Sequence, residues 1–197
     1  VKATDDINTL TKQDFVFVTI KSYALLSASE NLKKLSQSGS TLIMCSNGIP
    51  HWYFYKLSGI WKDYVIKAVD PESILSNAIL PTSLIGAVVY PACELSAPGV
   101  VKHIGGYRFS LGEPSGHKTQ RIETLSRALT KAGFKAPVRS NIRDEIWLKI
   151  LGNVSFNPLS VLTELTLDKI CTDSNLLLIV KDLMLETQAV GEKLGAH

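Results

Sequence analysis

The sequence has few cysteines and no arrangement of residues typical of a metal site. Its 197 residues include three cysteines, an odd count, with no C-x-x-C pair, and four histidines that show no ligand spacing. Zinc sites and disulfide frameworks both depend on such spacings. We therefore expect no bound metal and no disulfides. The three thiols, which we expect to be buried and reduced, are Cys45, Cys93 and Cys171.

The chain also lacks long apolar runs and a strong charge of either sign. No apolar stretch reaches the length of a transmembrane helix, and no basic-then-apolar start resembles a secretion signal. The net charge of +3 is too small and too scattered for a nucleic-acid surface, although it suits an anionic small ligand. We expect a cytoplasmic protein whose partners include no membrane and no nucleic acid.

A phosphate-binding loop is missing as well. The segment GEPSG at 112–116 has neither the spacing nor the lysine of a P-loop, so we interpret it as a turn. The sequence begins with Val1 rather than methionine and enters a strand almost at once. We expect that an amino-terminal piece precedes it.

The first apolar segments predict a β-α-β unit. Asp14 to Ile20 and Thr41 to Ser46 are short apolar runs typical of buried parallel strands, and Ser22 to Ser38 has helical spacing with Gly39 as its stop. Strands joined in this way run parallel through a right-handed crossover.

This unit places two polar residues at one edge of the predicted sheet. Lys21 follows the first strand and Asn47 the second, and open α/β sheets bind ligands beyond the carboxyl ends of their strands. The alternatives are a lysine that only begins a surface helix and an Asn47-Gly48 pair that only forms a turn.

The middle of the chain continues with sheet and helix patterns. His51 to Tyr55 is an aromatic cluster that could line a pocket or fill the core. Further elements are predicted as a strand over Ser83 to Tyr90, a hairpin over Gly99 to Leu111 turning at Gly105-Gly106, a helix over Thr119 to Ala132 and a short strand over Lys135 to Val138.

From Asn141 onward the periodicity is helical throughout. The composition shift near Ser140 predicts two domains, an α/β domain over 1–139 and a helical domain over 140–197. The last helix, over Asp173 to Leu194, has an apolar face too wide for the remaining helices to cover. Missing residues, a second subunit or a swapped element would cover it, and we expect a homodimer.

The first of the carboxyl-terminal helices carries one lysine and two asparagines on a shared edge. At about 100° per residue, Lys149, Asn153 and Asn157 lie roughly 0°, 40° and 80° around the helix axis. Asparagine is a mediocre helix former, so two of them one turn apart call for a reason. A cation and two amides converging on a small anionic or carbonyl ligand would supply one, with the lysine able to pass a proton.

A structural interpretation of the same residues is also open. Glu145 lies four residues before Lys149, the favourable order for a surface ion pair, and Asn157 precedes Pro158 and could cap a second helix. This interpretation leaves Asn153 without a role.

Taken together, these segments closely resemble the ketopantoate reductase family over nearly the whole chain. The most specific segment is the W-x-K-x-x-x-N-x-x-x-N-P pattern. The segments that carry the resemblance are DFVFVTIK at 14–21, NGIP at 47–50, PGVVKH at 98–103, LGEP at 111–114 and IWLKILGNVSFNP at 146–158.

The resemblance implies an NADPH-dependent 2-ketoacid reductase with a partial Rossmann-type sheet domain followed by an all-helical domain. It implies that Lys149 donates a proton and that Asn153 and Asn157 bind substrate. Lys21 and Asn47 match residues around the cofactor and the reacting carbonyl. The implied substrate is 2-dehydropantoate (ketopantoate) or a related small 2-ketoacid. The alternatives are a nucleotide-binding or sensing module and an inactive fragment of the same fold.

Overall fold

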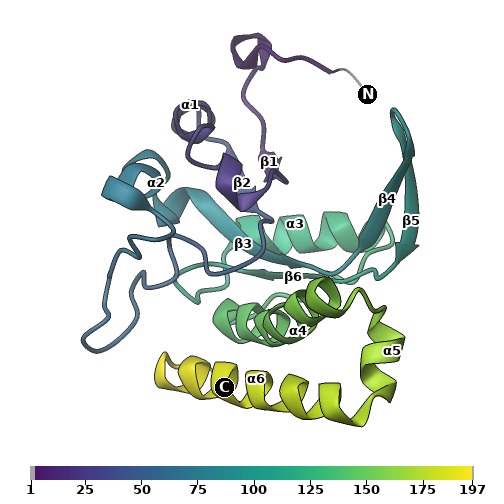
Figure 1. Cartoon of the computed structure of the whole chain (residues 1–197). Helices are drawn as coiled ribbons and strands as arrows, with labels where there is room; N and C mark the ends of the chain where they lie inside the picture. Colours follow the sequence, from purple (N-terminus) through teal and green to yellow (C-terminus); the bar gives the residue numbers. More distant parts are fainter. Residues whose placement is uncertain (1–2, 197) are drawn as a thin grey trace. The chain divides into compact units, whose positions relative to one another are not determined.

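The computed structural model describes residues 3–196, which divide into an α/β unit, Val1–Ile142, and a helical unit, Arg143–His197. Figure 1 shows the chain coloured along its sequence. The α/β fold with a parallel sheet and a helical carboxyl-terminal part agrees with the fold class expected from the sequence.

The α/β unit contains a four-stranded sheet in the order β1-β2-β3-β6. Strands β1 (Phe15–Val18), β2 (Thr41–Met44) and β3 (Leu84–Val89) are parallel, and β6 (Phe109–Gly112) runs antiparallel to β3. The predicted parallel β-α-β pairing is confirmed. Its register sets Val18 beside Met44 and Met44 beside Gly86.

The crossover between β1 and β2 starts differently from the prediction. Instead of one helix from Ser22, the chain forms a 3₁₀ turn, η2 (Ser22–Ala24), and then α1 (Ser29–Gln37). No side chain caps η2, and the amides of Ala24 and Leu25 bond back to the carbonyls of Lys21 and Ser22 in i+3 steps. The predicted stop is confirmed, because Gly39 follows α1 with φ +88°.

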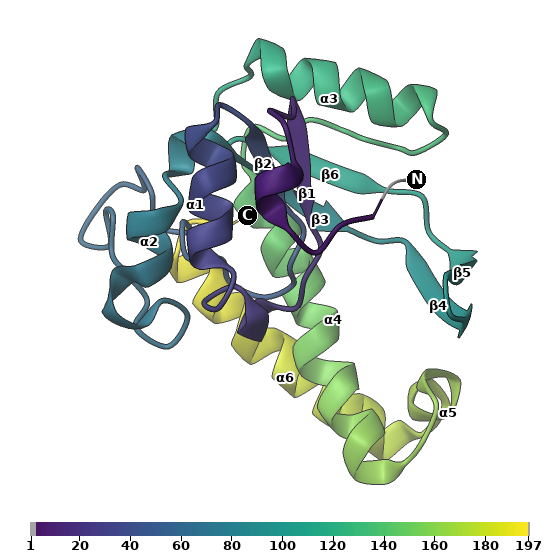
Figure 2. The same cartoon turned by 90° about the horizontal axis from the view of Figure 1, so that it is seen from above.

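The helix α3 (Gln120–Lys131) begins and ends as its sequence predicts. The Thr119 hydroxyl accepts a hydrogen bond from the Ile122 amide, and Gly133 with φ +94° ends the helix. It lies beside β6 (Figure 2), where its apolar side packs on the sheet. The buried core between them consists of Ile43, Ile85, Ala87, Leu111, Ile122, Leu125 and Ala136.

The aromatic cluster after Asn47 belongs to the core. Trp52, Tyr53 and Phe54 are 4%, 0% and 5% exposed. Trp52 lies against Gly86 so closely that a Cβ there would be 2.6 Å from its ring, which explains why β3 has a glycine at this position. The core-filling interpretation therefore holds for these three side chains.

The hairpin predicted around Gly105-Gly106 is wrong. The strands β4 (Ala92–Ala97) and β5 (Val100–Gly105) form a two-stranded sheet that turns at Pro98-Gly99, where Gly99 has φ +76°. This ribbon extends beyond the ends of β3 and β6 (Figure 1). At Gly106, with φ +77°, a Cβ would lie 2.6 Å from the Tyr90 carbonyl oxygen, so this glycine redirects the chain toward β6.

The short strand predicted over Lys135 to Val138 forms only two isolated parallel bridges with the β6 region. The amides of Phe109 and Leu111 donate to the carbonyls of Lys135 and Pro137, at 2.8 Å and 2.9 Å. Pro137 has no N–H that could donate a hydrogen bond back to the β6 region, so this segment does not form a full strand. The remaining short elements of the unit are η1 (Ile7–Thr9), η3 (Pro71–Ser73), α2 (Ile74–Ala78) and η4 (Pro81–Ser83).

The carboxyl-terminal part consists of α4 (Ile142–Thr163), α5 (Leu167–Thr172) and α6 (Ser174–Lys193). Asp173 caps α6, because its carboxylate accepts hydrogen bonds from the Asn175 and Leu176 amides at 2.9 Å and 3.0 Å. A small core of Leu159, Ile170 and Val180 joins these helices.

The expected wide apolar face on α6 is partly covered and partly open. Val180 is buried, whereas Ile179 and Val190 are 45% and 47% exposed. Within residues 3–196, no helix is long and apolar enough to cross a membrane. The expectation of buried thiols is wrong for Cys93 and Cys171, which are exposed on β4 and α5.

Candidate functional site

The carboxyl ends of β1 and β2 are tied together in the α/β unit. The Ser46 hydroxyl donates to the Ile20 carbonyl at 3.0 Å, and the Cys45 amide donates to the Val18 carbonyl at 3.1 Å. Lys21 directly follows Ile20 and Asn47 directly follows Ser46, so both lie next to the first of these bonds, and both are exposed. The structure therefore brings these two predicted site residues to one sheet edge.

The chain after Asn47 leaves room for a ligand at this edge. Gly48 has φ +88°, which favours glycine, and a Cβ built on it would meet no atom within 4 Å. A turn and an open approach to the backbone coincide here. An ammonium and a carboxamide beside open backbone can hold an anionic or carbonyl-bearing molecule.

The other three predicted residues lie on one continuous helix. Lys149 and Asn153 are half-buried and Asn157 is exposed. Because α4 continues through Pro158, Asn157 caps no second helix, and that interpretation is wrong. Steps of four residues put successive members of the set about 6 Å apart along the axis. They form a polar edge roughly 12 Å long, sufficient for a small acid.

Pro158 affects the end of this polar edge. It has no N–H for the Val154 carbonyl, and its ring crowds that turn, so a bend is expected just after Asn157. The hydroxyls of Ser155 and Thr163 donate to the carbonyls of Leu151 and Leu159, which adds side-chain bonds on either side of the proline. Asn157 therefore lies in the turn of α4 whose backbone hydrogen bonding the proline interrupts.

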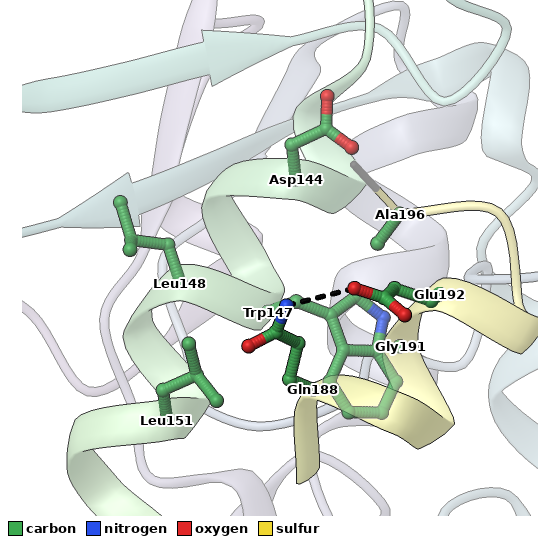
Figure 3. Close-up of a pocket in the computed structure, with 8 residues that line it drawn as sticks. All are labelled: Asp144, Trp147, Leu148, Leu151, Gln188, Gly191, Glu192 and Ala196. Atoms are coloured by element: carbon green, nitrogen blue, oxygen red, sulfur yellow. Dashed lines mark hydrogen bonds between the residues drawn. The ribbon is translucent and has the colours of Figure 1, made fainter. Parts of the chain in front are cut away.

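A pocket of about 290 Å³ lies on a different side of α4 (Figure 3). Trp147 and Leu151 line it, and they lie about 160° and 200° around the helix from Lys149. The pocket therefore faces away from the predicted polar edge. Its complete lining is Asp144, Trp147, Leu148, Leu151, Gln188, Gly191, Glu192 and Ala196.

The floor of this pocket is set by a close approach of α4 and α6. A Cβ on Gly191 would lie 2.9 Å from the Trp147 ring, so only glycine allows this packing without a shift. On the rim, the Gln188 amide donates to the Glu192 carboxylate at 2.7 Å (Figure 3). These contacts explain the pocket by helix packing, and the sequence interpretation did not foresee it.

Asp70 and His51 are two buried polar residues of the α/β unit. Asp70 is fully buried and accepts bonds from the Leu75 and Ser76 amides and the Ser76 hydroxyl, which fixes the start of α2. His51 is also buried. Burial lowers its pKa, although the Ile79 backbone and the Asp70 charge act in the opposite direction. A neutral core histidine is not a candidate acid.

The turn at 112–116 is an anchor, not a phosphate loop. The Gly116 amide donates to the Glu113 carbonyl at 2.9 Å, which confirms the predicted turn. The buried Glu113 carboxylate accepts from the Thr119 hydroxyl and the Arg121 guanidinium, and Arg121 also donates to the Thr82 carbonyl at 2.7 Å. In the described part of the chain, no group of three or more possible ligands could hold a metal ion.

An α/β sheet unit followed by helices is the fold that this chain shares with a solved structure assigned as a ketopantoate reductase. Residues 141–197 match the family model described as "Ketopantoate reductase PanE/ApbA C terminal". The resemblance expected from the sequence is thereby confirmed.

The relatives that cover the whole chain include a curated protein and a solved structure. It is 42% identical over 197 residues to the 2-dehydropantoate 2-reductase of Mesorhizobium japonicum and spans 60% of that protein. It also superposes with a TM-score of 0.93 and 34% identity on the crystal structure of a protein from Ralstonia solanacearum assigned as a ketopantoate reductase, covering 61% of it. The chain therefore spans about three-fifths of the length of these relatives.

Two other solved structures share the fold at lower identity. A dimeric ketopantoate reductase of Staphylococcus aureus matches with TM-score 0.71 and 17% identity, over 97% of this chain and 61% of its own. D-mandelate dehydrogenase in complex with NADH matches with TM-score 0.74 and 18% identity, over 95% of this chain and 57% of its own. Both show the fold alone.

Proposed function

We propose that the protein is an NADP-dependent oxidoreductase that reduces 2-dehydropantoate, or a related small 2-ketoacid, to the 2-hydroxyacid. The observation that supports it most is the polar edge of α4, with Lys149, Asn153 and Asn157 on one continuous helix. The 42% identity to a 2-dehydropantoate 2-reductase supports the substrate class, and with it a role in pantothenate biosynthesis.

In this proposal each residue of α4 has a separate task. The Lys149 ammonium donates a hydrogen bond to the ketone oxygen, stabilises the charge that develops there and then gives up its proton. The carboxamides of Asn153 and Asn157 bind the polar groups of the acid and orient it along the helix edge. NADPH, when bound, supplies the hydride.

The carboxyl edge of the sheet has donors that fit such a cofactor. Lys21 provides a cation for an anionic nucleotide, and Asn47 provides a carboxamide that can both donate and accept. The open backbone at Gly48 leaves space beside them. We propose Lys21 and Asn47 as cofactor-binding residues, with Asn47 also contacting the substrate.

The proposal extends to the assembly and the location. We propose that the protein is cytoplasmic. We also propose a homodimer, because α6 retains exposed apolar residues and a ketopantoate reductase with the same fold is dimeric. Sedimentation of the purified protein at several concentrations tests this; a monomer at all concentrations contradicts it.

A panel of 2-ketoacids tests the activity itself. We expect oxidation of NADPH with 2-dehydropantoate or a related branched acid, and formation of the matching 2-hydroxyacid. Substituting NADH for NADPH tests the nucleotide preference. Nucleotide binding without turnover of any acid would favour a sensing module instead. An absence of nucleotide binding, measured by calorimetry, would favour an inactive fragment.

A further inference from the structure

Tyr23 is a large aromatic side chain left open to water at the carboxyl end of β1. Its exposed fraction is 83%, compared with 46% for Tyr64 and 57% for Tyr107 in the same unit. A single exposed aromatic residue is common on protein surfaces and needs no function by itself. What distinguishes Tyr23 is its place, two residues after Lys21 at the edge proposed to bind the cofactor.

The backbone holds Tyr23 in a fixed position. It is the middle residue of η2, whose two ends are fastened by the bond from the Ala24 amide to the Lys21 carbonyl at 2.9 Å and the bond from the Leu25 amide to the Ser22 carbonyl at 3.1 Å. Leu25, which follows, is buried with 7% of its surface exposed. The turn therefore presents the ring from an anchored backbone, which lowers the entropic cost of using it in binding.

The surroundings of Tyr23 define the chemistry of a ligand. Lys21 supplies a positive charge, Asn47 supplies an amide, and the Ser46 to Ile20 bond joins the two strand ends that carry them. Tyr23 adds an aromatic face. A cation, an amide and an aromatic face on one edge complement a planar heteroaromatic ring that is linked to an anionic group.

We propose that Tyr23 stacks on the nicotinamide ring of the dinucleotide and positions it at the carboxyl edge of β1. This inference rests on the proposed function, in which Lys21 and Asn47 bind the cofactor and Asn47 also contacts the substrate, whose ketone carbonyl is reduced. The hydride donor must reach that carbonyl, so the ring beside these residues is the nicotinamide and not the adenine. The Tyr23 hydroxyl is not required, because the contact is made by the ring face.

The test compares Tyr23→Ala and Tyr23→Phe with Tyr107→Ala as a matched control on the β5 side of the unit. Calorimetry measures the affinity of each variant for NADPH, for reduced nicotinamide mononucleotide and for 2′-phospho-ADP-ribose. We expect Tyr23→Ala to weaken binding of the first two by about tenfold, in line with loss of one ring stack. Binding of the third ligand should not change, and Tyr23→Phe and Tyr107→Ala should bind as the unmodified protein does.

Fluorescence of the bound reduced nicotinamide gives a readout that does not depend on turnover, and its change on binding should be lost in Tyr23→Ala only. Unchanged affinity and fluorescence in Tyr23→Ala would overturn the inference while leaving the proposed function in place. If Tyr23→Ala weakens binding of 2′-phospho-ADP-ribose only, the Tyr23 ring contacts the adenine instead, which would also overturn the inference. If the unmodified protein binds no NADPH, the proposed function fails, and this inference fails with it.

Discussion

Ser46 donates its hydroxyl hydrogen to the carbonyl of Ile20 at 3.0 Å, which joins the carboxyl ends of β1 and β2. Ile20 directly precedes Lys21, and Ser46 directly precedes Asn47. One side-chain hydrogen bond thus connects the two segments that carry the proposed cofactor residues. Its removal should affect both stability and binding.

Replacing Ser46 with alanine tests this connection. We expect the free energy of unfolding to fall by about 0.5–1.5 kcal/mol, the usual net value of one intramolecular hydrogen bond. Affinity for NADPH should fall as well, since the two strand ends become less fixed. Urea denaturation and calorimetry measure the two effects. Ser27→Ala, which removes a local bond to the Ala24 carbonyl, is the control and should leave NADPH affinity unchanged.

Gly191 tests the packing of α4 on α6. A Cβ at this position would lie 2.9 Å from the Trp147 ring, so Gly191→Ala should destabilise the protein by about 1–3 kcal/mol through overpacking. At Gly152, also within a helix, a Cβ would meet no atom within 4 Å. Gly152→Ala should stabilise by about 0.5–1 kcal/mol through helix propensity. Equal effects of the two changes in thermal unfolding would contradict the packing geometry.

The amino-terminal cap of α6 provides a separate stability test. Asp173→Ala removes the acceptor for two helix amides and should lower the free energy of unfolding by about 1 kcal/mol. Asp182, an exposed acid within the same helix, is the control. Chemical denaturation of both variants measures the difference. If Asp182→Ala costs as much as Asp173→Ala, the cause is charge and not capping.

Buried His51 predicts a dependence of stability on pH. Because burial lowers its pKa below the value of 6.5 for an exposed histidine, the unfolded chain binds a proton more readily than the folded one. The stability linked to neutral His51 is therefore complete above about pH 6.5, the pKa of this residue in the unfolded chain. It decreases as the pH falls below that value toward the lower pKa of His51 in the folded protein. His51→Gln should reduce this loss between neutral and mildly acidic pH. The exposed His117, changed to Gln, should leave the profile as it is.

Several parts of the fold were predictable because local chemistry and tertiary structure agree there. The apolar runs of β1, β2 and β3 are too short for helices, and Thr119 and Asp173 are cap residues at the observed starts of α3 and α6. The meeting of Lys21 and Asn47 at one edge follows from parallel strands alone. This half of the candidate site required no packing detail.

Other parts depend on contacts that no local pattern reveals. Gly99 and Gly105-Gly106 are both typical turn sequences, so the sequence does not show which of them forms the hairpin. Only the close approach of Gly106 to the Tyr90 carbonyl shows that Gly105-Gly106 redirects the chain toward β6. Helix α4 continues through Pro158, although the pair Asn157-Pro158 is typical of the start of a new helix. The pocket beside Trp147 depends on Gly191, which is 44 positions further along the chain and belongs to a different helix.

The central proposal is that the Lys149 amine donates the proton, and Lys149→Ala tests it most directly. Steady-state reduction of 2-dehydropantoate by NADPH should slow by about 100-fold or more in this variant, the range expected for loss of a positioned acid, while unfolding and NADPH affinity stay unchanged. Lys169→Ala, an exposed lysine on α5, should retain full turnover. Full turnover in folded Lys149→Ala would contradict the assignment.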